Sequence, residues 1–569
     1  MGYYYFRPSY LTYHADSTQV KDSVSLKLLP VKGVPKEAQR RYYNGKTAFI
    51  LFGKNGEAPN KEMEYEDLTI LYYNKLNLRP KMLHRWINST QFSSLRRRKG
   101  GERPNYYSQY RQRRIQEKLN ELGIFRYVEL NYFPQDTIHK SDTLDLNIQA
   151  SFDKMINAEL ELNLAMKSND QAGPGAAFSL SRNNVFKGGE TWEIKLRGSY
   201  EWQTGKKTDK NSLMNSYELG VSSSLIIPRL LFPTLRKNEY EFPTTTTFKL
   251  YIDQLNRAKF YKILSFGGTV SYDWKPKRTS RHQFTPLNLN FNLLQHTTAR
   301  FDTIINENKM LAISMQNQFI PKMEYTYTYD NAPMKGRIRK NQVWWQTTVS
   351  SSGNITSLAY RAFGQDFSKK NKEFLNAPFA QFLKINTELR YTWNFSPKQS
   401  IVARFIGGVI SSYGNSQVAP YTEQFYIGGA NSIRAYTVRS IGPGSYYPGE
   451  RGRYTFIDQT GDIRLEANIE YRFPIVGDLR GALFLDAGNV WLLRNDEDRP
   501  GAKFNLKKFP EQVALGTGFG VRYDLDFLVC RFDCGVALHN PYKTSRSGYY
   551  NIERFKDGLG IHFAIGYPF

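Results

Sequence analysis

Apolar and polar side chains alternate along most of the chain over residues 156–569. In the segment 191–202, for example, aromatic and aliphatic side chains fall on one parity and charged side chains on the other. A period of two is typical of a strand with two different faces, whereas a helix repeats every 3.6 residues. About sixteen such segments follow one another, which predicts an antiparallel all-β architecture.

Two all-β architectures can produce this alternation. A soluble sandwich turns its apolar faces inward, whereas a membrane barrel turns them toward lipid and encloses a polar lumen. The barrel is favoured because most segments reach the roughly 9–11 residues of a tilted membrane strand. Short connections also alternate with long polar ones such as 411–461 and 492–511. Aromatic side chains at segment ends, where a girdle would lie, are Tyr200, Trp202, Tyr391, Trp393, Trp491, Tyr567 and Phe569.

We therefore predict a transmembrane antiparallel β-barrel of about sixteen strands over residues 156–569, with a large soluble β protein as the alternative. Residues 38–155 follow a different pattern, which predicts a small α+β domain. Its elements follow the order βααββ. They are a strand over 40–52, a helical region that begins at 67–71 and includes 80–87, a helix over 106–122, and two strands over 127–133 and 143–152.

Two further strands are expected over residues 3–13 and 23–29. They resemble the last two strands of an earlier copy of the same unit, without its first strand and helices. We therefore expect residues 1–37 to be the C-terminal part of a truncated domain. We also expect the natural protein to extend upstream, where its export signal would lie.

Composition adds limits to this picture. The chain has 569 residues, 40% of them apolar and 15% aromatic, and its mean hydropathy of −0.56 is that of a soluble protein. A barrel explains that average, because half of each strand faces a polar lumen. No apolar run approaches the roughly 20 residues of a membrane helix, which excludes a helical membrane protein. Cys530 and Cys534 lie too far apart along one strand for a disulfide.

Catalytic chemistry finds little support in the sequence. The seven histidines are scattered without a metal-ligand spacing, and no acid–base–nucleophile set is legible. We expect no enzyme activity, no metal site and no cofactor. The net charge of +26 is spread over the whole chain without a nucleic-acid motif, so no nucleic-acid partner is expected. Anionic lipid headgroups explain the basic clusters at 96–99 and 111–114 equally well.

Three strings occur in order in the C-terminal third: FYIGGANSIRAYTVRSIGPG over 425–444, DIRLEANIEYRFP over 462–474 and GALFLDAGNVW over 481–491. Together they resemble the BamA/TamA superfamily of outer-membrane assembly factors. The βααββ unit resembles the polypeptide-transport-associated (POTRA) domain of that family. The long spacings and the GYYYF near the start are most similar to the TamA-like lipoprotein (TamL) branch of Bacteroidetes-type bacteria. The resemblance implies a bacterial outer-membrane barrel with its POTRA domains in the periplasm.

The same resemblance implies a functional loop, here about 411–461, that folds back into the lumen and is held at its tip by an arginine. The matching tip residues are Ile433, Arg434, Ala435 and Tyr436, with Ala435 in place of the usual glycine. The family's wall acids match Glu470 and Asp486. Both acids lie opposite in phase to the apolar residues of their segments, which independently places them in the lumen. There the planar fork of Arg434 would pair with both carboxylates.

The alternation also places four glycines on the lumen side of their strands, namely Gly516, Gly518, Gly520 and Gly535. We interpret them as a smooth inner wall beside the folded-in loop, because glycine allows a backbone to approach closely. A locally weak sheet is the alternative. The resemblance further implies a weak lateral seam between the first and last strands, where an incoming strand would pair by β-augmentation. The seam residues expected on this basis are Leu160, Leu162, Ile561, Phe563 and Phe569.

These implications define an expected function. The chain would be an outer-membrane assembly and translocation factor that captures unfolded β-barrel or surface proteins and inserts them through the seam. Its partners would be unfolded outer-membrane clients, outer-membrane lipids, and a periplasm-spanning TamB-like protein or accessory lipoproteins. Two alternatives stay open: a two-partner-type polypeptide secretion pore, and a structural or adhesive outer-membrane barrel.

Overall fold

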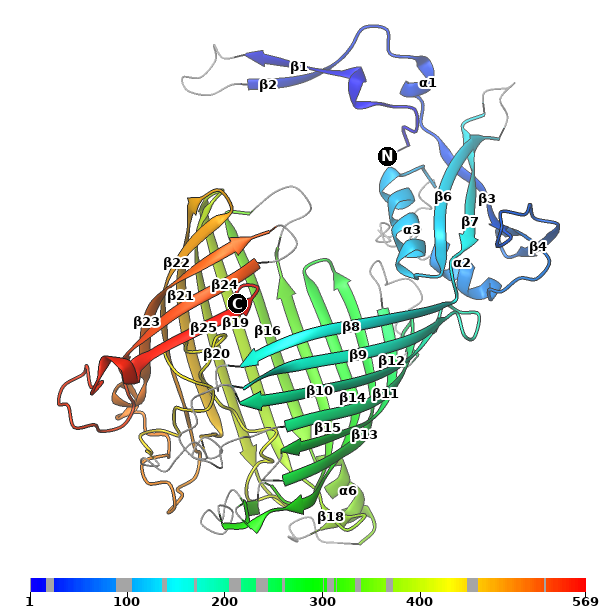
Figure 1. Ribbon diagram of the computed structural model, residues 1–569. Helices are drawn as coiled ribbons and strands as arrows, with labels where there is room; N and C mark the ends of the chain where they lie inside the picture. The colour runs from blue at the N-terminus through cyan, green and yellow to red at the C-terminus, as the bar shows by residue number, and fades with distance from the viewer. Residues whose placement is uncertain are drawn as a thin grey trace.

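A large curved β-sheet follows a smaller α+β domain in the chain (Figure 1). The computed structural model describes residues 2–16, 25–88, 105–135, 141–167, 171–203, 216–231, 244–257, 261–299, 301–303, 312–313, 315–332, 339–364, 372–447, 459–525 and 529–569. The basic cluster at 96–99 lies outside these residues.

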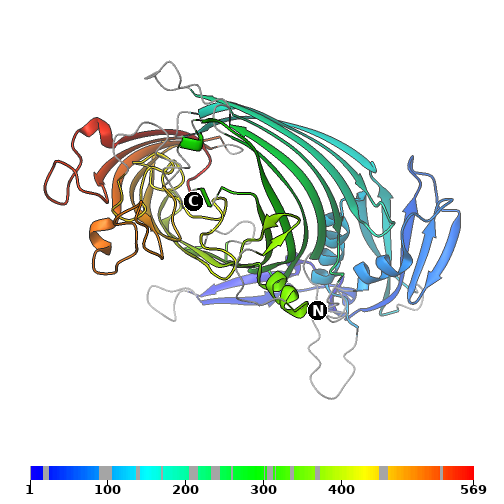
Figure 2. The same ribbon diagram turned by 90° about the horizontal axis from the view of Figure 1, so that it is seen from below.

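Sixteen antiparallel strands form one sheet that curls around a central space (Figures 1 and 2). Each strand pairs with its neighbours along the chain, so the order is a simple meander. The strands are β8 (Ile156–Lys167), β9 (Gln171–Asn183), β10 (Thr191–Gln203), β11 (Ser216–Ile227), β12 (Thr244–Arg257), β13 (Tyr261–Lys277), β14 (Ser280–Thr297), β15 (Gln318–Asp330), β16 (Asn341–Ser352), β19 (Phe382–Ser396), β20 (Gln399–Ser412), β21 (Ile463–Val476), β22 (Leu479–Trp491), β23 (Ala514–Asp524), β24 (Val529–His539) and β25 (Leu559–Ile565). The predicted sixteen-stranded transmembrane barrel is confirmed.

Side chains alternate between the two faces of this sheet. On β21, Asn468 and Glu470 are buried on the inner face, whereas Ile469 points outward and is 51% exposed. The outward apolar side chains form the surface that a bilayer covers. Not every aromatic side chain lies in the predicted girdle. Trp491 is fully buried against Phe504, because the loop after β22 folds over it.

The first and last strands, β8 and β25, are the two edges of the sheet. Among the described residues, β8 pairs with β9 alone and β25 pairs with β24 alone. The last strand is also short, with seven residues against twelve in β8. Unpaired backbone donors and acceptors therefore lie along both edges, where a further strand can add.

The α+β domain is a five-stranded sheet with helices on one side. Its sheet has the order β4-β5-β3-β7-β6. The elements are β3 (Tyr43–Phe52), β4 (Lys61–Tyr65), β5 (Leu68–Tyr72), α2 (Pro80–Asn88), α3 (Gln109–Glu121), β6 (Phe125–Pro134) and β7 (Thr143–Phe152). Leu83 and Ile87 of α2 and Ile115 and Leu119 of α3 are fully buried in its core. None of the helices in the described ranges has the length and apolar character needed to cross a membrane.

Two element predictions in the N-terminal part are wrong. The stretch 67–71 was expected to begin a helix, but it forms β5, which pairs in parallel with β3 and antiparallel with β4. The first strand was expected over 3–13, but β1 is Leu11–Asp16, because a 3₁₀ turn over Pro8–Tyr10 precedes it. The remaining N-terminal elements are β2 (Ser25–Pro30), which pairs with β1, and the short α1 (Lys36–Gln39).

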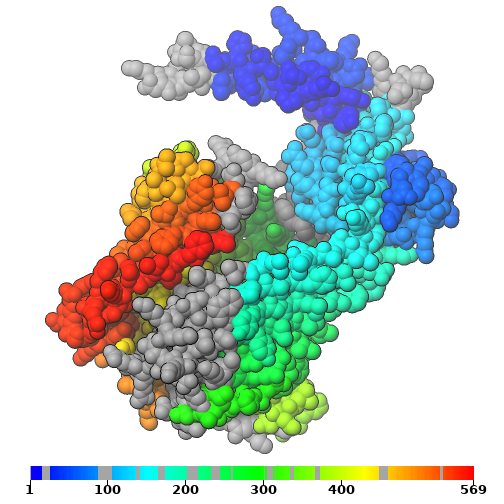
Figure 3. Space-filling view, viewed as in Figure 1, coloured from blue at the N-terminus to red at the C-terminus, as the bar shows by residue number. Residues whose placement is uncertain are grey.

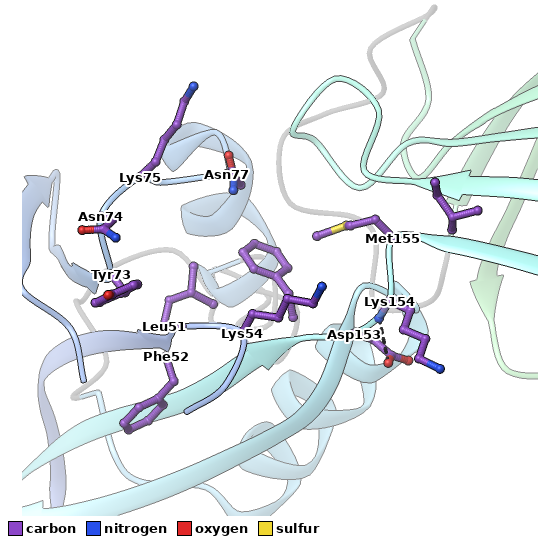
Figure 4. A pocket seen from close by; sticks show the side chains of 13 residues that line it. Leu51, Phe52, Lys54, Tyr73, Asn74, Lys75, Asn77, Asp153, Lys154 and Met155 are labelled. Atoms are coloured by element: carbon purple, nitrogen blue, oxygen red, sulfur yellow. Dashed lines mark hydrogen bonds between the residues drawn. The ribbon is translucent and has the colours of Figure 1, made fainter. Parts of the chain in front are cut away.

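The α+β domain contacts the barrel at the turn between β9 and β10. Asn184 Nδ2 donates to the carbonyl oxygen of Asn77 at 2.7 Å, and the amide of Arg79 donates to the carbonyl of Lys187 at 2.8 Å. A cleft of about 580 Å³ lies at this junction (Figure 4). Aromatic and aliphatic side chains and three lysines line it, together with Met155 at the entry to the first barrel strand.

Candidate functional site

The loop between β20 and β21 turns back into the barrel. Its described parts, 413–447 and 459–462, lie within the ring of strands in Figure 2. Loop side chains such as Phe425 and Ile427 join one buried apolar cluster with the wall residue Val490. The lumen is therefore filled by the loop at this level.

Arg434 lies at the tip of this loop and is completely buried. Its Nε and Nη2 atoms donate to the two carboxylate oxygens of Asp486, each at 2.8 Å, and its backbone amide donates to Asp486 Oδ2 at 3.0 Å. Its Nη1 atom donates to Oε2 of Glu470. The guanidinium also lies over the ring of Phe484, with Cζ 3.5 Å from the ring centroid. Charge-assisted bonds of this kind are strongest where water is excluded.

Further charged groups extend this site across the wall. Arg472 Nε donates to Glu470 Oε1 at 2.8 Å, and Arg522 Nη2 donates to Glu470 Oε2 at 3.2 Å. Arg522 Nη1 lies 2.7 Å from Asp533 Oδ1 on β24. On the edge strand β25, His562 Nε2 lies 2.7 Å from the carbonyl oxygen of Arg434. The contacts thus run from the loop tip through the wall strands to the edge strand β25.

The loop backbone is also tied to the wall beside the tip. Asn468 Nδ2 donates to the carbonyl of Ser432 and to Asp486 Oδ1, each at 2.9 Å. Arg404 Nη2 donates to the carbonyl of Asn431 at 2.9 Å. Sequence reasoning missed these contacts, although the parity of Asn468 matches that of the predicted acid Glu470 and could have identified it.

The other tip residues pack against the wall. Ile433 is fully buried in the cluster that contains Val490. Tyr436 donates its hydroxyl to the carbonyl of His539 at 2.6 Å. Ala435 replaces a glycine of the family pattern, and its φ is not in the left-handed region. Alanine therefore fits this tip without backbone strain.

Three wall glycines lie directly beneath the loop tip. A Cβ on Gly535 would lie 2.6 Å from the carbonyl oxygen of Arg434, and one on Gly560 would lie 2.4 Å from the same oxygen. A Cβ on Gly516 would lie 2.5 Å from Cβ of Ala435. These distances are too short for non-bonded atoms, so glycine is required for the loop backbone to reach the wall.

The other two predicted lumen glycines have different neighbours. A Cβ on Gly518 would lie 2.1 Å from the carbonyl oxygen of Cys534 and 2.5 Å from Phe484 Cζ. A Cβ on Gly520 would meet the side chains of Arg522 and Asp533. Glycine at these two positions leaves space for neighbouring residues of the barrel wall. The close approach of the loop tip depends on Gly516, Gly535 and Gly560 instead.

Substituting alanine at Gly535 is expected to displace the loop tip, because the new Cβ would collide with backbone atoms. Overpacking of this kind typically costs about 1–3 kcal/mol. Trypsin should then cleave after Arg434 in the folded barrel, and mass spectrometry would detect the new peptide. Gly198→Ala is the matched control, since its Cβ would meet Leu219 Cδ2 at an ordinary 3.4 Å. Equal resistance of both variants to trypsin would contradict the close approach.

The prediction that Phe569 lies on the seam is wrong. Strand β25 ends at Ile565, and Gly566 has a φ of +84°, which turns the chain away from the strand. The ring of Phe569 lies 4.7 Å from Cζ of Arg404, and its carbonyl oxygen accepts a bond of 3.2 Å from Arg472 Nη2. The C-terminal residue thus packs on the inner arginines.

The other four residues predicted for the seam belong to the two edge strands, Leu160 and Leu162 to β8 and Ile561 and Phe563 to β25. Leu160, Leu162, Ile561 and Phe563 are between 56% and 73% exposed. The two cysteines, Cys530 and Cys534, are unpaired. Within the described ranges, no group of three or more His, Cys, Asp or Glu side chains is placed to hold a metal ion.

Comparisons with known proteins agree with this architecture. Residues 184–569 match the Omp85 superfamily domain. A segment of 181 residues is 28% identical to the outer membrane protein assembly factor BamA of Neisseria meningitidis serogroup B, covering 30% of this chain and 21% of that protein. A segment of 227 residues is 28% identical to BamA of Nitratidesulfovibrio vulgaris, covering 37% and 26%. The chain thus spans about a fifth to a quarter of the length of these curated relatives.

A solved structure shows the same fold. The crystal structure of BamA from Haemophilus ducreyi lacking POTRA domains 1–3 superposes with a TM-score of 0.56 over 98% of this chain and 88% of that chain, at 13% identity. The matched family domain covers the barrel from the end of β9 to the last residue, including the loop, its wall acids and the edge strand β25. The chain therefore belongs to the Omp85 superfamily.

Proposed function

We propose that the chain is an outer-membrane assembly factor, which captures unfolded β-barrel or surface proteins and inserts them through a seam between β8 and β25. The observation that carries this proposal is that, in the part of the chain that the structure describes, the sixteen-stranded sheet has two unpaired edges, β8 and β25. Two relatives bear the name of outer membrane protein assembly factor, which supports the same conclusion.

The edges would work by β-augmentation. An incoming strand satisfies its own backbone donors and acceptors by pairing with β8 or β25, which is the main requirement for entering a lipid environment. The free energy of client folding would drive the step, because each new hairpin pairs further backbone groups. Both edge strands carry outward leucine, isoleucine and phenylalanine side chains that suit a lipid-facing surface.

The α+β domain would act before the seam, as a POTRA domain in the periplasm. Its sheet ends in two edge strands, β4 and β6, which offer pairing sites for extended client segments. Residues 1–37 would belong to a further domain of this type. Tyr13 and Leu28, paired on β1 and β2, are both at least half exposed, as expected for a hairpin face that packs against another element.

The buried Arg434 would fix the loop during insertion. Bonds to Asp486 and Glu470 hold the tip on β21 and β22, and the contact with His562 connects it to β25. Partners would include outer-membrane lipids and a periplasm-spanning TamB-like protein or accessory lipoproteins, and the branch would be TamL-like. A loop packed inside the lumen favours insertion at the seam over passage of a polypeptide through the barrel.

Reconstitution tests this function. The purified chain is incorporated into vesicles of phosphatidylethanolamine and phosphatidylglycerol, and a urea-unfolded outer-membrane barrel is added as client. We expect the client to reach its heat-resistant folded form much faster than with vesicles that hold an unrelated barrel of similar size. Folding at the same rate in both vesicle preparations would contradict an assembly role. Client found inside the vesicle lumen would instead support a secretion pore.

A further inference from the structure

Helix α6 (Asn354–Ala362) has an apolar face that is exposed. Ile355 is 66% exposed and Leu358 is 64% exposed, and Ala359 and Ala362 are exposed beside them. The spacing i, i+3, i+4 and i+7 places these four side chains on one helix face. Phe363, directly after the helix, is 87% exposed. A helix of this kind normally packs its apolar face against a core or a membrane.

The opposite face of α6 is fixed to the barrel rim by polar contacts. Asn354 Nδ2 donates to Ser351 Oγ at 2.8 Å and to the hydroxyl of Tyr413 at 2.7 Å. Ser357 is fully buried, and its hydroxyl donates to Oε1 of Gln381 at 3.3 Å. Because these bonds join the helix to the ends of β16, β19 and β20, its apolar face must point away from the rim. Figure 1 shows α6 at the end of the barrel opposite the α+β domain.

Helix α6 belongs to the loop between β16 and β19, and other contacts of this loop show that it covers the outer surface of the barrel wall. Phe266, Phe291 and Phe319 lie side by side on neighbouring strands. Phe291 is on the same face of β14 as the exposed Leu287, so the three rings lie on the outer face of the sheet. Phe374, in β17 (Glu373–Phe374), packs on Phe319 with ring centroids 5.1 Å apart. The loop therefore continues the lipid-facing surface, and it includes β18 (Ala377–Pro378).

We propose that α6, with the exposed side chains Phe363, Phe374 and Leu375, lies in the outer leaflet of the membrane and binds its acyl chains. Leu375 is 75% exposed and Phe374 is 42% exposed, so both add to the apolar face of the helix. Continuity with the lipid-facing wall selects lipid as the occupant over a soluble partner. Figure 3 shows this segment, in yellow-green, on the surface at the far end of the barrel. The helix would anchor the loop between β16 and β19 at the bilayer boundary, as interfacial helices do.

Spin labels measure where the helix lies. Leu358→Cys places a label on the apolar face and Arg361→Cys places one on the exposed polar flank, each in a Cys530→Ser/Cys534→Ser background. The full chain is reconstituted in vesicles of phosphatidylethanolamine and phosphatidylglycerol, and collision rates with oxygen and with a water-soluble nickel chelate are recorded. We expect the ratio of oxygen to nickel collisions to be severalfold higher at position 358 than at position 361.

Two results would overturn the proposal. A ratio at position 358 as low as that of a label in water would show that the apolar face is not in the membrane. Shielding of position 358 from both reagents would show that protein covers the helix, and dipolar broadening between labels would identify that protein as a second copy of the chain. Heat-resistant mobility of each labelled protein in a gel confirms that the barrel is folded, so a failed fold cannot imitate either result.

Discussion

Arg434→Ala is expected to release the loop from the lumen wall and to reduce client insertion at least tenfold. The substitution removes two side-chain hydrogen bonds to Asp486 and one to Glu470. The bond from the backbone amide to Asp486 can survive only if the loop stays docked. Among the described residues, Asp486 would then be buried without an ion-pair partner, whereas Glu470 keeps Arg472 and Arg522. Breaking a buried pair in this way typically costs about 3–5 kcal/mol. Insertion is measured in the vesicle assay, and undocking as an increase in ion conductance through the barrel.

Arg439→Ala is the matched control for this experiment. Arg439 lies in the same loop, but its guanidinium stacks on the rings of Tyr421 and Tyr426. Among the described residues, removing Arg439 leaves no buried carboxylate without an ion-pair partner, so insertion should change little. Arg434→Lys should fall between the two variants, because a lysine keeps the charge but cannot make the two-pronged contact with Asp486. If Arg434→Ala inserts clients as fast as Arg439→Ala, the loop contact has no role in insertion.

The inner face of the barrel could be predicted from parity because a strand alternates strictly. That rule alone places Glu470 and Asp486 in the lumen, and both carboxylates accept hydrogen bonds from Arg434. Parity alone does not give the pairing between distant strands. The approach of Arg522 to Asp533 depends on the register of β23 against β24, in which Arg522 lies opposite Arg531. The register between two strands depends on many backbone contacts at once, so it cannot be predicted from the sequence of one strand.

The errors have local physical causes. Leu68 and Leu71 are three residues apart, as on a helix face, and this spacing concealed a five-residue strand that is held by two partners. At the C-terminus, the alternation predicts a strand that continues through Gly566 and Pro568 to Phe569. Glycine permits the turn seen at residue 566, and proline lacks the amide needed to continue the ladder. The pattern of side chains indicates which face a strand presents, but it does not indicate where a strand ends.

A disulfide across the seam is expected to abolish insertion while leaving the barrel folded. Leu160→Cys combined with Ile561→Cys places one thiol on each edge strand, and a Cys530→Ser/Cys534→Ser background is required. Cys534 lies directly opposite Ile561 in the β24–β25 ladder and would otherwise capture the new thiol. A bridge needs Cα atoms about 4.4–6.8 Å apart, so its formation also shows that the two edges can meet. Once joined, they have no free backbone groups for a client strand at that level, and reduction should restore insertion.

The same β24–β25 ladder supplies the control. Ile561→Cys with native Cys534 retained and Cys530→Ser joins two strands that are already paired, so it restrains β25 without closing the seam. Oxidation of this variant should leave insertion close to its reduced rate. A shifted pair, Leu162→Cys with Ile561→Cys, covers the neighbouring register on the same outward face. If a fully oxidised seam still inserts clients at the reduced rate, the seam does not open during assembly, and the unpaired edges of β8 and β25 are not the site of client entry.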